Sequence, residues 1–158
     1  MDGQLHVLAC TNTGHGSGCL LGRVAPAAAL DRASWRFWDG AAWGEDWRRA
    51  TPVFDGASYV TLTFSPFVGR YLAWYMPPFD ETILVRSALS LEGPWSAPQL
   101  VGRGAPSLDP NNWDYALVAH PELDREAGRI VTLSYFRPGA FLDGEIRLVE
   151  VTFASPRG

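Results

Sequence analysis

Three carboxylates lie at the ends of short apolar segments and are the clearest candidates for chemistry. Asp55 precedes the segment 59–64, Asp114 directly precedes 115–121, and Glu122 directly follows that segment. In a pair of carboxyl groups, the protonated one can donate a proton to a reacting group, and the ionised one can accept a proton from water. The spacing along the chain does not place any two of the three at a catalytic separation, and the sequence holds no complete catalytic motif.

Two histidines are further candidates. His120, in Ala-His-Pro-Glu-Leu, closes an apolar segment, where a lone histidine is usually a hydrogen-bonded structural residue. His15 and Ser17 lie close together in TGHGSGC, but Gly16 takes the place that serine would need in a Gly-x-Ser-x-Gly nucleophile elbow. This glycine-rich stretch is therefore predicted to be the tip of a hairpin.

The elements that must position these residues are short β-strands. Residues 59–64 alternate apolar and polar side chains, whereas 70–76 is apolar on both faces, as in a strand that is covered on each side. Prolines restrict the segment 95–101 to the edge of a sheet, because proline has no N–H for the ladder. The predicted strands form three successive groups: 5–12, 19–25 and 34–43; 59–64, 70–76, 82–88 and 95–101; 115–121, 129–136 and 145–153.

A meander that recurs every 40 to 50 residues or so is typical of the blades of a β-propeller. We therefore predict an all-β fold, a partial β-propeller of about three blades built from four-stranded antiparallel meanders; a β-sandwich with ordinary meanders is the alternative. Residues 5–50 would form an incomplete blade, 51–104 a full blade, and 111–155 a last blade without its outer strand. Since a ring needs about four or more blades, we expect this chain to belong to a longer propeller or to self-associate and so cover its open edges.

Composition excludes some partners and leaves the redox state open. The 158 residues carry a net charge of -4 and no basic run, which argues against nucleic acid and anionic membranes as partners. No segment reaches the roughly 20 apolar residues that span a bilayer. The N-terminus lacks the features of a signal peptide, so the protein is either cytoplasmic or has a leader upstream. Cys10 and Cys19 flank the predicted hairpin tip, and both a cross-strand disulfide and two reduced thiols are consistent with that placement.

One stretch of the chain resembles a known family. An Arg-Ser pair near the end of a strand is followed by Gly-Pro-Trp-Ser-x-Pro, with FSPFVGRYLAWY before it and AHPELDREAGRIVTLSY after it. This pattern resembles the five-bladed propellers of the glycoside hydrolase family 43 type, which include arabinanases and β-xylosidases, and is closest to a related bacterial family of domains of unknown function (family 4185). The resemblance covers most of residues 19–153, as the C-terminal three blades of such a ring. It is carried by Arg86, Ser87, Gly93, Pro94, Trp95, Ser96 and Pro98.

The resemblance implies a carbohydrate-directed module whose ligand, a glycan or oligosaccharide, binds at one mouth of a central channel. Glycoside hydrolysis needs a carboxylic acid and a carboxylate from different strands. Asp55 and Asp114 are then the candidate catalytic residues, with much of the acid/base site outside this chain. The candidate substrate-binding residues are Trp113, Tyr59, Tyr115 and Glu122.

The resemblance also implies that His120 lies near the propeller axis and holds a calcium ion directly or through water, although no cofactor is required and no Asp-rich loop supplies oxygen ligands. A secreted or cell-surface location is expected. The alternative function is a non-catalytic propeller that binds a glycan or a protein. Asp80 and Glu81 are expected to be solvated, and Trp35 and Trp47 to pack between repeats or at an edge.

Overall fold

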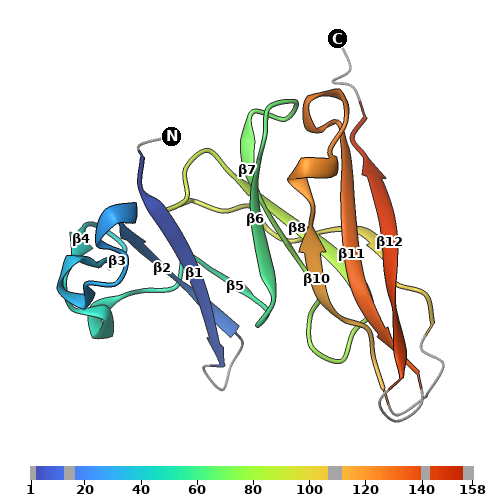
Figure 1. The fold of residues 1–158 in the computed structure, drawn as a ribbon, viewed down its shortest axis with the longest axis horizontal. Helices are drawn as coiled ribbons and strands as arrows, with labels where there is room; N and C mark the ends of the chain where they lie inside the picture. The colour runs from blue at the N-terminus through green and yellow to red at the C-terminus, as the bar shows by residue number, and fades with distance from the viewer. Residues whose placement is uncertain (1–2, 13–16, 107–111, 140–142, 155–158) are drawn as a thin grey trace. The chain divides into compact units, whose positions relative to one another are not determined.

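The computed structural model describes residues 3–12, 17–106, 112–139 and 143–154, which form β-strands and short 3-10 helices. The predicted all-β class with antiparallel sheets is confirmed (Figure 1). Within the described ranges no helix has the length and apolar character needed to cross a membrane. The chain divides into two compact units, which we describe separately: unit 1 is Met1–Ser58 with Leu91–Trp95, and unit 2 is Tyr59–Ser90 with Ser96–Gly158.

The first sheet of unit 2 is the predicted four-stranded antiparallel meander. Its strands follow one another in the order β6 (Val60–Ser65), β7 (Arg70–Tyr75), β8 (Thr82–Ala88) and β9 (Gln99–Arg103). β7 is buried over most of its length, which explains why its sequence is apolar on both faces. The edge strand was predicted to begin at residue 95, but it begins at Gln99, so Trp95 and Pro98 precede the ladder.

The second sheet of unit 2 is a three-stranded antiparallel meander. It consists of β10 (Tyr115–Ala119), β11 (Ile130–Pro138) and β12 (Gly144–Thr152). β11 is the central strand and is largely buried, whereas β12 exposes most of its side chains. Two 3-10 helices, η4 (Pro121–Leu123) and η5 (Glu126–Gly128), occupy the connection between β10 and β11.

Side chains of both sheets form the hydrophobic core of unit 2. Trp74 of β7 is completely buried, and its indole N–H donates a hydrogen bond of 3.1 Å to the hydroxyl of Thr63 on β6. That bond satisfies the one polar group of an otherwise apolar side chain. Leu117 of β10 and Leu133 of β11 belong to the same cluster as Trp74. The core therefore holds the two meanders of unit 2 together and fixes the ends of their strands.

Unit 1 contains one sheet with β2 at its centre. β1 (Leu5–Asn12) pairs with one side of β2 (Ser17–Val24), and β3 (Arg36–Trp38), β4 (Trp43–Gly44) and β5 (Phe54–Gly56) complete the sheet. The single outer strand predicted over 34–43 is instead two short strands, because Asp39 accepts hydrogen bonds from the amides of Ala41 and Ala42 and so closes a turn. β5 joins this sheet through the pair Cys19 and Phe54, although the first repeat was predicted to end at residue 50.

Cys10 and Cys19 form a disulfide bond in unit 1. They are direct partners in the register of β1 and β2, so the bond links two adjacent strands. Of the two alternatives that the sequence left open, the structure contains the disulfide. The last three residues of the predicted hairpin tip, Ser17 to Cys19, belong to β2, whereas residues 13–16, which include His15, lie outside the described residues.

Candidate functional site

Asp114 is the most unusual side chain of unit 2. It immediately precedes β10 and has no exposed surface. Neither of its carboxylate oxygens has a hydrogen-bond partner among the described residues. A buried polar group without a partner destabilises a fold and is retained in native proteins only where something compensates, so Asp114 is the first candidate for a functional residue.

Gly104, in the segment that follows β9, lies directly against the Asp114 carboxyl group. The amide of Gly104 donates to the carbonyl oxygen of Glu81 at 2.7 Å, and the amide of Ala105 donates to the hydroxyl of Tyr135 at 2.8 Å. The carbonyl oxygen of Pro106 accepts a hydrogen bond from Arg137. These three bonds attach the Gly104–Pro106 segment to both sheets of unit 2, so the position of Gly104 against Asp114 is fixed by the fold.

Arg137 is buried close to Asp114, yet it is committed to other partners. One guanidinium nitrogen lies 3.2 Å from Glu145 and another donates to Pro106. Glu145 is in turn bound by Arg147, at 2.7 Å from its Nε. Glu145 and Pro106 thus hold two nitrogens of the Arg137 guanidinium, while its Nε is buried without a hydrogen-bond partner among the described residues. Arg137 does not hydrogen-bond Asp114 and neutralises that carboxylate only in part.

The pKa of Asp114 is raised from its ordinary value of 3.8 to about 6. Burial is the largest cause, since it penalises the charged form, and the nearby carboxylate of Glu81 raises the pKa further. The positive charges of Arg137 and Arg147 act in the opposite direction and are outweighed. Asp114 can therefore carry a proton at mildly acidic pH, which is the property required of a general acid.

β10 is irregular directly after Asp114. Its pairing with β11 shifts register between Tyr115 and Val118, and Ala116 has a positive φ of 57°. A non-glycine residue in this conformation is strained. Bulges of this kind re-aim neighbouring side chains and are enriched next to active sites. The irregularity is a second, independent feature that marks the start of β10.

An aromatic pair adjoins the buried acid. Trp113, the residue before Asp114, packs against Phe79 with ring centroids 4.3 Å apart and planes at 58°. Phe79 lies in the connection between β7 and β8, is 76% exposed and has a positive φ of 62°. Such a pair offers an apolar surface to a ligand, because Phe79 has little else to pack against.

Phe79 and Glu81 are the site residues that sequence reasoning missed. Asp80 is exposed as expected, whereas Glu81 is half-buried and its charge raises the pKa of Asp114. The order of the strands could have indicated that both residues lie near the end of β9. In an antiparallel meander the connection between the second and third strands lies at the same end of the sheet as the end of the fourth strand, here Arg103 opposite Thr82.

The other predicted catalytic and binding residues are dispersed. Asp55 is an exposed residue of β5 in unit 1. Tyr115 is 40% exposed and packs against Phe136 at 5.2 Å. Tyr59 is 57% exposed, and no contact recorded for the described residues joins it to Asp114 or Trp113. Unit 2 therefore brings together Asp114 and Trp113, and unit 1 holds Asp55.

His120 has hydrogen-bond partners on both ring nitrogens. Nδ1 lies 3.0 Å from a carboxylate oxygen of Glu122, and Nε2 lies 2.7 Å from the hydroxyl of Ser134. A carboxylate can only accept, so Nδ1 carries the proton and a neutral ring accepts from Ser134 through Nε2. This arrangement fits the structural alternative for His120. Among the described residues no group of three or more His, Cys, Asp or Glu side chains could hold a metal ion.

Replacement of Gly104 by alanine tests the contact over Asp114. A Cβ at Gly104 would lie 2.3 Å from Oδ2 of Asp114, so we expect Gly104→Ala to lower the free energy of unfolding by about 1–2 kcal/mol through overpacking. Gly102→Ala is the matched control on β9, because a Cβ there meets nothing within 4 Å. Chemical denaturation of both variants measures the difference. Equal stabilities would contradict the contact, and Asp114→Ala in the Gly104→Ala background should recover most of the loss.

The fold and this site define an all-β protein of antiparallel meanders with a buried carboxyl group at one end of a sheet. A domain of unknown function (DUF4185) matches residues 2–137, and the chain belongs to this family. A solved structure from Bacteroides ovatus ATCC 8483, described as a "putative hydrolase", is similar over 85% of this chain and 35% of its own, with a TM-score of 0.65 and 14% sequence identity. This likeness shows the fold alone, and the chain spans about a third of that protein. No protein of the curated set matches.

Proposed function

We propose that this chain is a carbohydrate-directed module, part of a β-propeller that resembles glycoside hydrolases, with its sugar site beside Trp113 and Phe79. One observation carries the proposal: the carboxyl group of Asp114, buried and with a pKa of about 6, directly follows Trp113, whose half-buried ring packs against the exposed ring of Phe79. Aromatic faces stack on the apolar faces of sugar rings, and an acid with a raised pKa is what glycosidic bond cleavage requires.

Two features support the wider setting of the proposal. The meanders of unit 2 have the strand order of propeller blades, and a longer ring accords with the share of 35% that the chain covers in the Bacteroides structure. The disulfide between Cys10 and Cys19 fits a secreted or cell-surface protein, because such bonds persist in oxidising surroundings.

In the catalytic form of this proposal Asp114 protonates the leaving oxygen of the glycosidic bond. Among the carboxylates that act on Asp114, Glu81 raises its pKa most and so favours the protonated form that donates. Asp114 has no exposed surface, so a substrate would contact it only after the Gly104–Pro106 segment moves. The remaining acid/base groups would come from other strands of the ring.

The complete burial of Asp114 favours a second candidate function, a non-catalytic glycan-binding module. In this form the aromatic pair of Trp113 and Phe79 holds the sugar, and Asp114 stays buried. The two functions share a ligand class and differ in whether a bond is broken.

The test combines binding and hydrolysis of arabinan and xylan oligosaccharides. If the module binds sugars, Trp113→Ala should weaken binding by roughly 10-fold or more, since stacking and hot-spot aromatics contribute on this scale, whereas Trp47→Ala in unit 1 should not. If it is catalytic, Asp114→Asn should lower kcat by about 100-fold or more with little change in binding, and Asp80→Asn should leave kcat unchanged. The wild-type rate should also decline above about pH 6, as Asp114 loses its proton.

The outcomes separate the two functions. Sugar binding that depends on Trp113, without release of reducing ends, supports the binding module and removes the catalytic form. Release of reducing ends that Asp114→Asn leaves unchanged removes Asp114 from the mechanism, and Asp55→Asn then tests the other predicted acid. Absence of any binding to these oligosaccharides would reject the carbohydrate proposal.

A further inference from the structure

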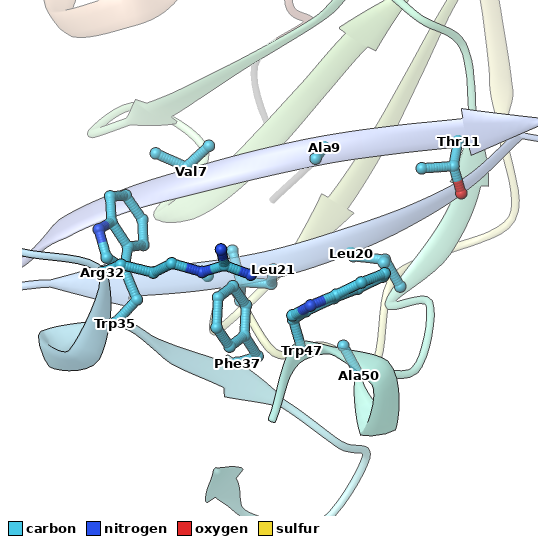
Figure 2. Close-up of a pocket in the computed structure, with 11 residues that line it drawn as sticks. Val7, Ala9, Thr11, Leu20, Leu21, Arg32, Trp35, Phe37, Trp47 and Ala50 are labelled. Carbon is cyan, nitrogen blue, oxygen red and sulfur yellow. The ribbon is translucent and has the colours of Figure 1, made fainter. Parts of the chain in front are cut away.

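Unit 1 contains a pocket of about 370 Å³ on one face of its sheet (Figure 2). Val7, Ala9 and Thr11 of β1 line this pocket together with Leu20 and Gly22 of β2. Val7 is the register partner of Gly22, and Ala9 is the partner of Leu20. The side chains of Trp35, Phe37 and Trp47 add aromatic walls. A pocket of this size is in the range that accommodates a small organic molecule.

Small residues keep the pocket open. Gly22 has no side chain, and a Cβ at this position would already lie 3.4 Å from the ring of Phe37 and 3.5 Å from that of Trp35. Ala9 lies on β1 two residues beyond Val7, the register partner of Gly22, and is therefore its diagonal neighbour in the sheet. Ala50 lines the pocket just after the 3-10 helix η3 (Trp47–Arg49). A larger side chain at any of these positions would occupy the space that the aromatic rings surround.

Arg32 contributes the pocket's only formal charge among the described lining residues. It lies in the 3-10 helix η2 (Arg32–Ser34), and in Figure 2 its side chain runs toward Leu21 and Phe37. No hydrogen bond or ion pair of its guanidinium is formed with the described part of the chain. Its neighbour Asp31 does not neutralise it by contact, because the Asp31 oxygens accept from the amide of Ala33 and the hydroxyl of Ser34.

Other arginine and tryptophan side chains of unit 1 have partners within the unit. Arg36 pairs with Glu45 at 2.9 Å, and the guanidinium of Arg23 lies 4.1 Å from the ring centre of Trp43. The indole N–H of Trp35 donates to the carbonyl oxygen of Ala29 at 3.0 Å, which fixes that wall of the pocket. Arg32 thus differs from these neighbours, because it lines an apolar pocket and its exposed guanidinium has no partner among the described residues.

We propose that this pocket binds a small amphipathic anion, an aromatic or aliphatic body that carries a carboxylate group. The apolar body would lie against the sheet and the rings of Trp35, Phe37 and Trp47, and the carboxylate would bind Arg32. The planar guanidinium matches a carboxylate in a bidentate arrangement. A sugar fits less well, because the apolar lining would leave most of its hydroxyl groups without partners.

Isothermal titration calorimetry with 2-naphthoate and its neutral analogue 2-naphthamide tests the proposal on the intact protein. We expect 2-naphthoate to bind roughly 10- to 100-fold more tightly than the amide, on the scale of a hydrogen-bonded charged group. Arg32→Gln should abolish that preference and leave the amide unaffected. Arg48→Gln is the matched control, since Arg48 lies over the ring of Trp47 and pairs with Asp46 without lining the pocket.

A pocket-filling variant shows where the ligand binds. Ala50→Leu should weaken both compounds about equally, by roughly 10-fold or more, while thermal unfolding shows that the variant remains folded. Equal affinities for the acid and the amide, an Arg32→Gln variant that binds like the wild type, or no binding at all would overturn the proposal. Displacement of 2-naphthoate by arabinan or xylan oligosaccharides would overturn it in favour of a sugar subsite. None of these results depends on Asp114 or Trp113, so this test stands apart from that of the proposed function.

Discussion

At about pH 7.5 the Asp114→Asn variant is expected to gain about 2.5 kcal/mol in stability over the wild type, relative to the difference between the two at about pH 4. The pKa of Asp114 rises from 3.8 to about 6 on folding, mainly because the carboxyl group is buried, and its oxygens have no hydrogen-bond partner among the described residues. A raised pKa in the folded state means that folding favours the protonated form. The stabilising contribution is therefore complete below pH 3.8 and is lost as the pH rises through 6.

Asparagine has nearly the shape of aspartic acid and does not ionise, so it removes this pH dependence and little else. Urea unfolding of both proteins at several values of pH measures the change in the difference between their free energies of unfolding. Other carboxylates titrate in both proteins and cancel, and Asp80→Asn controls for the loss of one exposed charge. A difference that stays constant with pH would show that Asp114 is ionised equally in the folded and unfolded states.

Reduction of the disulfide between Cys10 and Cys19 is expected to lower the stability of unit 1 by about 2.5 kcal/mol. The two cysteines are 9 residues apart, so the cross-link closes a short loop and restricts the unfolded chain. Without it, the pairing of β1 with β2 depends on backbone hydrogen bonds and on side chains of β1 that are largely exposed. We expect the loss of stability to be largest in the hairpin of β1 and β2.

Hydrogen exchange with and without dithiothreitol measures this effect at the amides of β1 and β2. Amide protection in β1 should fall on reduction, whereas amides of β7 and β11 in unit 2 should change little. The double variant Cys10→Ala with Cys19→Ala is the control, because reductant should not alter its exchange. If both thiols are shown to be free after reduction and protection in β1 is unchanged, the disulfide contributes nothing to this hairpin.

The strands of unit 2 were predictable because the signals that define them are local. Alternation over 59–64, apolarity on both faces over 70–76 and the turn at Gly69, with a φ of 68°, indicate a meander without reference to distant residues. Unit 1 was harder. Its third strand is broken by a turn at Asp39, and β5 pairs with a strand that lies more than thirty residues earlier, as Phe54 opposite Cys19 shows.

Among the site residues the sequence alone identified Asp114 and Trp113 from their place before an apolar segment, but it did not show that Asp114 would be buried without partners. It did not indicate Phe79 or Glu81, because their role depends on the connection between β7 and β8 lying at the same end as Arg103. It also left His120 open, and only the folded chain shows a ring bonded on both sides.

The sequence by itself thus determined the all-β class, the order of the strands in the meander of unit 2, and the short list of acids that could react. Periodicity and turn residues act over a few positions, so they can be recognised in a single sequence. Tertiary structure decided the disulfide, the pocket beside Arg32 and the raised pKa of Asp114. Each of these depends on which distant residues come into contact and exclude water, since the energy of a charge or an apolar surface is set by what surrounds it.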